Sequence, residues 1–375
     1  MEKELSHMTV EISQDKSILV AGYTTRGVVQ SAFKAGYRNI YAVDHFCDID
    51  LMNCVKYAKQ FNELNELPPA INEIISQYHI DGIITTSGAE LLNLQNRIGS
   101  NPETIARFMN KKDTQIFLED LNVPVPKLLD DNVYPAMMKP IYGAGGWRNK
   151  IVMNEYEQSE WEDFIGYIPY IKQEIIEGIP ASVSCISNGK SAIAIASNEQ
   201  ILRGGTEYPY AFSGSVTPCT HPMSDRMMDI AEQIVTASGC IGSVGVDFVL
   251  TDTDAYAIEI NPRFQGTVDS VELSTRLNLF KLHVDACNGI VPTERPIPKQ
   301  FCIRKIVTAL NPCTIQDSIH LKQDFNGLVT DIPQPNTKFK KGDVMFACIG
   351  VGFTKKDALI SLDKNISNAI QYIME

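Results

Sequence analysis

The chain begins with short apolar runs that alternate with a segment of helical spacing. Residues 17–22 (SILVAG) and 39–43 (NIYAV) are apolar, and residues 25–35 between them carry apolar positions at helical intervals. This order predicts a β-α-β unit and hence a parallel sheet. A further apolar run at residues 81–86 leads into residues 87–90 (SGAE), the position at which an open α/β sheet places its ligand contacts.

Helix-capping residues and prolines divide the rest of the chain. Asn101, Pro102 and Glu103 supply an N-cap, a proline at the first helical position and an acid in the first turn, so a helix is expected there. Proline-rich connectors at residues 123–134 and 292–298 indicate boundaries. We expect an N-terminal domain over residues 1–98, a mixed α and β domain over residues 99–292 with a subdomain at about 125–185, and a β-rich C-terminal domain over residues 293–375.

The most informative segment is residues 245–263 (GVDFVLTDTDAYAIEINPR). Its alternating strands flank a polar turn, which predicts a hairpin; with the turn centred on Thr253, Asp247 lies opposite Glu259. One face of this hairpin is expected to be apolar and to pack on the core, and the other to be polar. The apolar face would carry Val246, Phe248, Leu250, Tyr256, Ile258 and Ile260, and the other face Gly245, Asp247, Val249, Ala257, Glu259 and Asn261.

The polar face of the hairpin is a candidate metal site. Cross-strand neighbours lie roughly 5 Å apart, so Asp247, Glu259 and Asn261 can converge on one small cation. Two carboxylates and an amide oxygen suit Mg²⁺ (or Mn²⁺), which completes its coordination with waters and phosphate oxygens. Arg263 can offer a planar fork to the same anion. The alternative is an ordinary hairpin whose solvent-facing side happens to be acidic.

A second cluster has the composition of a phosphate-binding loop. In residues 135–146 (PAMMKPIYGAGG), Lys139 ends an apolar strand and three glycines follow within four positions. Backbone amides can approach a polyphosphate closely where no side chain intervenes, and lysine adds a compact positive charge. A flexible loop with an incidental lysine is the alternative. Residues 170–178 (YIKQEIIEG) form a strand and a turn suited to presenting backbone groups to a planar base.

The order of these motifs resembles the ATP-grasp superfamily over about residues 100–292. The motifs are K-P-x-x-G-x-G-G, then Q-E-x-x-E-G, then G-V-D-F-V-L with E-I-N-P-R about ten residues further on. The whole chain resembles predicted ATP-dependent carboligases of archaea and bacteria. The resemblance implies an α/β fold: a Rossmann-like N-terminal domain, a two-part α+β ATP-grasp domain and a small β-rich C-terminal domain.

The resemblance also implies individual roles. The lysines and glycines would hold the phosphates of ATP, Lys112 being an alternative to Lys111, and the strand after the loop would contact adenine and ribose. The implied nucleotide-binding residues are Lys111, Lys139, Gly143, Gly145, Gly146, Gln173, Glu174, Ile176 and Glu177. The implied metal ligands are Asp247, Glu259 and Asn261, and the implied catalytic residues are Arg263 and Lys139.

The chemistry implied is attack of a carboxylate on the γ-phosphate of ATP, followed by attack of an amine on the acyl phosphate. The expected partners are therefore a small carboxylate and a small amine. Carboxylation or phosphoryl transfer in the same fold, and a non-catalytic nucleotide-binding protein, remain alternatives. His221 could act as a base or be structural, and Arg203 and Tyr210 are candidates for binding the carboxylate.

Composition limits the other function classes. Lysine and arginine total 33 against 45 acidic residues, a net charge of −12, which argues against a nucleic-acid partner. The sequence has no apolar run suited to spanning a membrane, and residues 1–16 do not resemble a leader. A cytoplasmic protein is therefore expected, and a homodimer is compatible with the sequence. The nine cysteines have no C-x-x-C spacing and are expected to be reduced.

Overall fold

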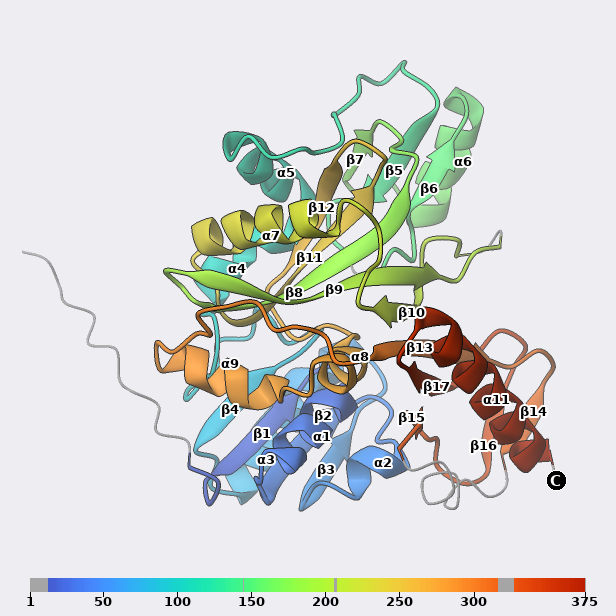
Figure 1. The fold of residues 1–375 in the computed structure, drawn as a ribbon. Coiled ribbons are helices and arrows are strands. Elements are labelled where there is room, and N and C mark those ends of the chain that lie inside the picture. The colour runs from blue at the N-terminus through green and yellow to red at the C-terminus, as the bar shows by residue number, and fades with distance from the viewer. Residues whose placement is uncertain (1–12, 144, 206–207, 316–326, 375) are drawn as a thin grey trace, which may run out of the picture.

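The computed structural model describes residues 13–143, 145–205, 208–315 and 327–374. Its N-terminal part is a parallel sheet of order β3-β2-β1-β4, which confirms the predicted β-α-β unit (Figure 1). The elements are β1 (Ser17–Ala21), α1 (Arg26–Lys34), β2 (Asn39–Asp44), α2 (Ile49–Met52), β3 (Tyr57–Gln60), the 3-10 helix η1 (Leu64–Glu66), α3 (Leu67–Gln77) and β4 (Gly82–Thr85). Residues 1–12, which belong to the segment expected not to be a leader, lie outside the described residues.

Two helices and a small antiparallel sheet follow. The elements are α4 (Pro102–Met109), α5 (Lys111–Asp120), β5 (Ala136–Pro140), β6 (Lys150–Val152), α6 (Glu155–Ile165) and β7 (Tyr170–Gln173). Asn101 caps α4 as predicted, because its side chain accepts a hydrogen bond from the Thr104 amide at 2.8 Å. The sheet β6-β5-β7 packs on α6 around Trp161 and stands apart from the rest of the molecule in Figure 1. We call β5, β6, α6 and β7 the lid.

The centre of the molecule is an eight-stranded antiparallel sheet of order β12-β11-β8-β9-β10-β13-β17-β15. Its first part contains β8 (Ile179–Asn188), β9 (Ala192–Leu202), β10 (Phe212–Thr217), α7 (Ser224–Ser238), β11 (Ile241–Leu250), β12 (Ala255–Asn261), α8 (Val268–Thr275) and α9 (Leu279–Cys287). Helix α7 covers one face of β8, β9 and β11, and α9 packs on β8 and β11.

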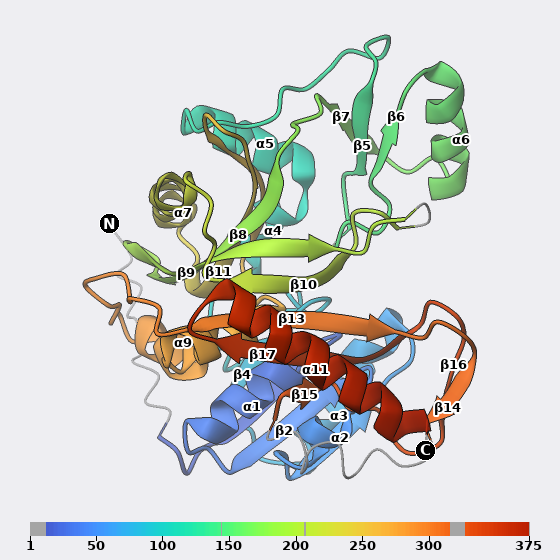
Figure 2. The same ribbon diagram turned by 45° about the vertical axis from the view of Figure 1, so that its right-hand side comes forward.

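The C-terminal part extends this sheet. It contains β13 (Phe301–Thr308), β14 (Cys313–Ile315), β15 (Val329–Thr330), β16 (Thr337–Phe339), β17 (Val344–Gly352) and α11 (Lys355–Met374). Helix α11 crosses β17 and β13 (Figure 2). Because β13 pairs with β10, the boundary expected at residue 293 falls in the connection between two parts of one continuous sheet.

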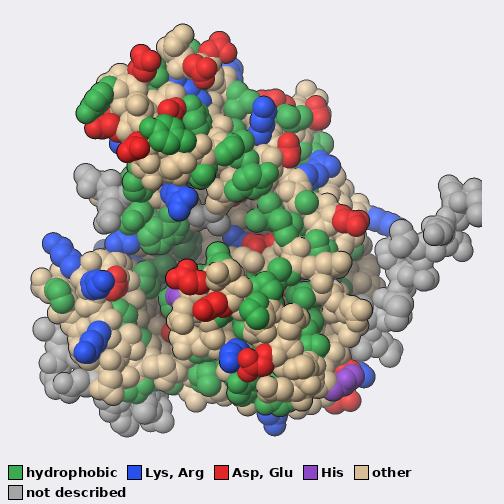
Figure 3. All heavy atoms as spheres, turned by 180° about the vertical axis from the view of Figure 1, so that it is seen from behind, with side chains coloured by type: hydrophobic (Ala, Val, Ile, Leu, Met, Phe, Trp, Pro, Cys, Tyr) green, Lys and Arg blue, Asp and Glu red, His purple; other side chains and the backbone are tan. Residues whose placement is uncertain are grey.

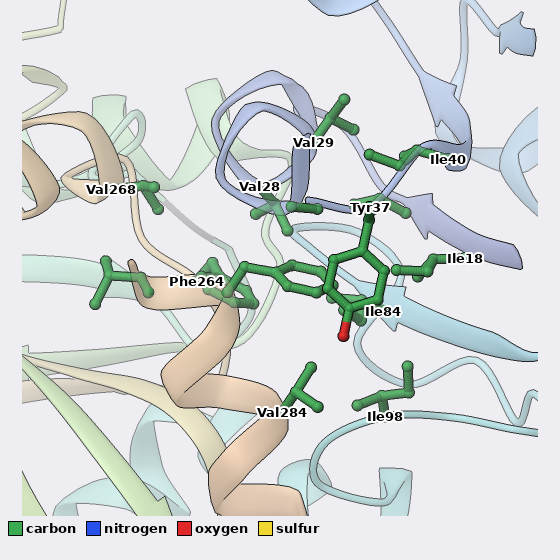
Figure 4. Packing of buried hydrophobic residues seen from close by; sticks show 14 of the residues in the cluster. Ile18, Val28, Val29, Tyr37, Ile40, Ile84, Ile98, Phe264, Val268 and Val284 are labelled. Carbon is green, nitrogen blue, oxygen red and sulfur yellow. The ribbon is translucent and has the colours of Figure 1, made fainter. Parts of the chain in front are cut away.

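A shared hydrophobic core joins the N-terminal sheet to the helices that follow β12. Val28 of α1 and Ile84 of β4 pack with Val268 of α8 and with Val284 of α9 (Figure 4). The ring of Tyr37 meets Phe280 edge-on, with centroids 5.0 Å apart. The N-terminal sheet is therefore fixed on the ATP-grasp-like segment by buried apolar side chains and not by a flexible tether.

A buried ion-pair network adds the C-terminal part to the same assembly. Arg26 donates to both carboxylate oxygens of Asp269 at 2.7 Å and to Asp331 at 2.9 Å. Arg304 pairs with the same two acids, and Asp50 accepts the Asp331 amide at 3.2 Å. Burial opposes ionisation of Asp269, but the neighbouring guanidinium of Arg26 holds its pKa below the usual value. These charges link α1, α8 and the strand β13.

Candidate active site

The predicted hairpin forms, and the pairing expected from a turn centred on Thr253 holds at its polar end, whereas next to the turn the register is shifted by one residue. Asp247 of β11 pairs with Glu259 of β12, and Gly245 pairs with Asn261. The prediction of the hairpin faces was wrong in one part. Ile258 is an extra residue in a β-bulge, so the alternation of β12 changes there and Phe248 faces Ala257. Beyond the bulge Ala255 and Ala257 are buried in the core, whereas Tyr256 and Ile258 are only partly buried.

The polar end of the hairpin forms a hydrogen-bonded cluster. Asn261 donates to one oxygen of Asp247 at 3.0 Å, and Gln200 of β9 donates to the other at 2.9 Å. Burial and the nearby Glu259 carboxylate raise the pKa of Asp247 to about 7. Two acids held this close favour a cation between them. Gln200 was not predicted; the polar run 197–200 within an otherwise apolar strand is the signal that could have indicated it.

Arg263 is held between the hairpin and the N-terminal sheet. Its Nε donates to Glu90 at 2.9 Å, and one terminal nitrogen donates to Asn261 at 3.1 Å. Glu90 follows β4, is 4% exposed, and also accepts the Gly88 amide at 2.6 Å. The segment predicted to follow an open-sheet strand thus contacts the guanidinium directly, although Glu90 was not assigned a role from sequence.

The two predicted phosphate lysines lie together beside these acids. Lys111, at the start of α5, is 3.3 Å from Glu259 and donates to the Gly143 carbonyl at 2.7 Å. Lys139, at the end of β5, is 8% exposed; its burial lowers its pKa to about 8, although Glu259 acts in the opposite direction. Lys112, the next residue, is exposed. The geometry therefore favours Lys111 over Lys112 for a ligand at this point.

The glycine loop contacts this cluster through the Gly143 carbonyl, which accepts the hydrogen bond from Lys111. Gly143, Gly145 and Gly146 all have positive φ angles, and a Cβ atom on Gly146 would lie 2.3 Å from the Tyr210 carbonyl oxygen. Trp147 packs edge-on against Tyr208, with ring centroids 4.7 Å apart. Ala144 and residues 206–207 lie outside the described residues. Figure 3 shows the surface hollowed between the lid and the remainder of the molecule.

The segment predicted to contact adenine contains a buried amide with an unused acceptor. Gln173 is 2% exposed and donates to Gln115 at 2.8 Å, but its Oε1 has no hydrogen-bond donor among the described residues. The Glu174 amide donates to the Lys127 carbonyl at 2.9 Å, and the Glu174 carboxylate accepts the Lys127 amide at 2.9 Å. Of the backbone groups predicted to contact adenine, the Glu174 N–H is therefore already engaged.

The remaining predicted residues lie in this segment or elsewhere. Ile176 is partly buried and Glu177 is exposed. Arg203 donates to the Gly342 carbonyl at 2.7 Å, so its charge is directed towards the C-terminal part. His221 accepts the Met223 amide at 3.2 Å at the start of α7, which is a local structural contact. In the described part of the chain, no three His, Cys, Asp or Glu side chains group as a metal site by themselves.

Comparison with known proteins places the fold. Residues 108–267 match the ATP-grasp domain family, so the chain contains an ATP-grasp domain, a fold that implies ATP-dependent chemistry through acyl phosphates. An uncharacterized protein of Methanocaldococcus jannaschii is 28% identical over 354 residues, which cover 87% of this chain and 85% of that relative.

Solved structures of similar fold include both ligases and carboxylases. The L-amino acid ligase from Bacillus licheniformis has a TM-score of 0.72 at 15% identity, covering 95% of this chain and 98% of its own. The biotin carboxylase domain of the Hydrogenobacter thermophilus 2-oxoglutarate carboxylase, a dimer crystallised with MgADP, ADP and bicarbonate, has a TM-score of 0.77 at 13% identity, covering 95% and 90%. These likenesses confirm the α/β ATP-grasp architecture predicted from the motifs. None of the described helices has the length and apolarity needed to cross a membrane.

Proposed function

We propose that this protein is an ATP-dependent ligase that activates a carboxylate as an acyl phosphate and joins it to an amine, with release of ADP and phosphate. The observation that carries the proposal is the convergence of two lysines, two acids, an amide and an arginine at the end of one hairpin. Lys111 lies 3.3 Å from Glu259, Asn261 lies 3.0 Å from Asp247, and Arg263 donates to Asn261. These residues come from α5, from β5, from the hairpin and from the segment just after it.

The residues present fit an adenine nucleotide with Mg²⁺ or Mn²⁺. The unused Gln173 acceptor suits the amino group of adenine, since a buried carbonyl oxygen without a donor is costly until a ligand supplies one. Asp247, Glu259 and Asn261 offer hard oxygen ligands, and phosphate oxygens would complete the coordination of the ion. MgATP, when bound, would supply the phosphoryl group that activates the carboxylate.

Two lysines and an arginine of the chain would bind the reacting groups. Lys139 and Lys111 would bind phosphate oxygens, and their charge offsets the negative charge spread over the phosphoryl group during transfer. Arg263 would orient the carboxylate and stabilise charge on the acyl phosphate, while Glu90 fixes the direction of its guanidinium.

The glycine loop would keep water away from the acyl phosphate. The loop contacts Tyr208 and Tyr210, which lie between β9 and β10, so Trp147 and the loop backbone would cover the bound phosphates from the lid side. An acyl phosphate hydrolyses when water reaches it, so exclusion of water separates productive ligation from loss of ATP.

The test is ADP release from MgATP with a panel of small carboxylic acids, with and without a panel of amines, and mass spectrometry of the products. We expect ADP release that needs both an acid and an amine, with an amide as product. Glu259→Gln should abolish turnover with an unchanged circular dichroism spectrum. Glu73→Gln, which removes a charge from an exposed pair with Lys59 in the N-terminal part, is the matched control and should keep full activity.

Other outcomes would assign a different function. ADP release with bicarbonate, or with a hydroxyl acceptor in place of the amine, would indicate carboxylation or phosphoryl transfer. Binding of MgATP without turnover across the whole panel would contradict the ligase proposal and support a nucleotide-binding protein. Wild-type turnover in Glu259→Gln would refute the assignment of the metal ligands.

A further inference from the structure

Four aromatic rings gather at the carboxyl ends of three neighbouring strands of the N-terminal sheet. Tyr23 follows β1, His45 and Phe46 follow β2, and Phe61 follows β3. Tyr23 stacks on His45 with centroids 4.5 Å apart and an interplanar angle of 12°. Phe46 meets both rings edge-on at 5.5 and 4.7 Å, and Phe61, which is 2% exposed, lies beneath them. We call these residues the aromatic cluster.

A buried carboxylate fixes the two turns that carry the exposed rings. Asp44 is 1% exposed, and one of its oxygens accepts the Thr25 amide at 2.5 Å and the Thr25 hydroxyl at 2.8 Å. Its other oxygen accepts the Phe46 and Cys47 amides, both at 2.8 Å. Tyr23 and Phe46 nevertheless remain 37% and 41% exposed. Two large rings are thus held rigidly at the surface, an arrangement that favours a binding role over core packing.

The aromatic cluster adjoins the arginine of the candidate active site. The Tyr23 amide donates to the Ser87 carbonyl at 2.7 Å, and Glu90, three residues further on, contacts Arg263 at 2.9 Å. Three residues of chain span at most about 11 Å, so Tyr23 and Arg263 contact the same short segment after β4. The carboxyl edge of a parallel sheet is also where such folds bind ligands.

The charges around the aromatic cluster favour a cation. Burial, and to a smaller extent the carboxylates of Glu63 and Asp44, raise the pKa of the Tyr23 phenol. The Nδ1 of His45 donates to the Phe61 carbonyl at 3.1 Å, so in the neutral ring the lone pair is on Nε2, which can accept from an N–H donor. Ring faces attract ammonium groups, and acidic neighbours repel carboxylates.

We propose that the aromatic cluster binds the amine substrate, and that this substrate is a primary amine carrying an aromatic ring. The ring lies against Tyr23 and Phe46, and an N–H of the amine donates to His45 Nε2. Arg263 and the metal ligands remain for the carboxylate and for the acyl phosphate formed from it, whose carbonyl carbon the amine attacks with loss of phosphate. This inference rests on the proposed ligase function and names the class of one substrate.

The test measures binding of phenethylamine, with phenylacetate and propylamine as probes that lack its charge or its ring. Saturation-transfer NMR and calorimetry should show saturable binding of phenethylamine at least ten times tighter than either of the other probes. Phe46→Ala and Tyr23→Ala should each weaken it at least fivefold. Phe353→Ala, which removes an aromatic side chain that is 87% exposed in the C-terminal part, is the control and should change nothing.

Several results would overturn the inference. These are absence of saturable phenethylamine binding to the wild-type protein, equal or tighter binding of phenylacetate, and unchanged binding in a folded Phe46→Ala variant. The binding assay needs no ATP, so failure of the ligase proposal does not prevent it. Conversely, an amide-forming reaction whose KM for the amine is the same in wild type and Phe46→Ala would retain the ligase and reject the site.

Discussion

Replacing Glu90 by alanine tests whether the N-terminal part takes part in the chemistry. Glu90 is in the N-terminal part and Arg263 in the ATP-grasp domain, 173 residues apart, and their side chains are 5% and 16% exposed. Without the carboxylate, Arg263 keeps hydrogen bonds to Asn261 and to the Phe264 carbonyl but loses the contact at its Nε. The guanidinium can then rotate away from its direction in the native site.

The size of the effect follows from the geometry. A misplacement of about 1 Å in a reacting group costs roughly 100-fold in rate, which corresponds to about 2.7 kcal/mol in the activation barrier. A broken, nearly buried pair that keeps its other hydrogen bonds should cost about 2 kcal/mol in stability. We expect kcat for amine-dependent ADP release to fall about 100-fold. The Kd of MgATP should stay within about threefold of the wild-type value, because the lysines and metal ligands are unchanged.

A double-mutant cycle makes the test specific to this pair. If Glu90 acts through Arg263, the double variant Glu90→Ala with Arg263→Lys should be no slower than Arg263→Lys alone. Glu73→Ala removes the partner of Lys59 from a pair whose two side chains are each 37% exposed, and should cost at most about 1 kcal/mol with no change in kcat. Additive losses in the cycle, or full activity in Glu90→Ala, would refute the reasoning.

Two other residues give independent predictions. Gln173→Leu removes the unused buried acceptor, so the Kd of ATP should rise about fivefold to tenfold while binding of GTP is unaffected, as calorimetry can measure; an unchanged Kd of ATP would place adenine elsewhere. Burial lowers the pKa of His283 to about 4 against an ordinary value of 6.5. Below about pH 6.5 the unfolded chain binds a proton at this histidine, whereas the folded chain binds it only near pH 4. The free energy of unfolding therefore decreases as the pH falls through this window, by about 2 kcal/mol between pH 7.5 and 5. Urea unfolding of His283→Gln should show about that much less pH dependence, and an equal dependence would contradict the assignment.

Local patterns predicted the parts of the site that lie close together in the sequence. The polar turn and its apolar flanking strands were enough to predict the hairpin, and Asp247 lies opposite Glu259 as expected, although the bulge at Ile258 shifts the register nearer the turn. The Asn101 cap followed from three consecutive residues. In each case the determining interactions are made within a short segment, so the pattern of residue types carries the information.

Contacts between distant segments were not predictable in the same way. Gln200 meets Asp247, and Glu90 meets Arg263, only because the strand order of the sheets brings them together. The bulge at Ile258 also escaped prediction, since nothing in the alternation of β12 separates an extra residue from a regular one. The buried pair of Arg26 and Asp269 likewise joins segments 243 residues apart.

The Arg26 network has a mechanical consequence. Buried charges and a common apolar core lock the N-terminal sheet, α8 and the C-terminal strands into one stiff frame, whereas β5, β6 and β7 form a separate sheet that is joined to its neighbours by the bridge between Leu128 and Gln173 and by the hydrogen bond from Gln173 to Gln115. During a catalytic cycle the lid should therefore open and close as one rigid body, by hinge motion at the chain segments that connect it. The binding surfaces for both substrates should stay in place beneath it.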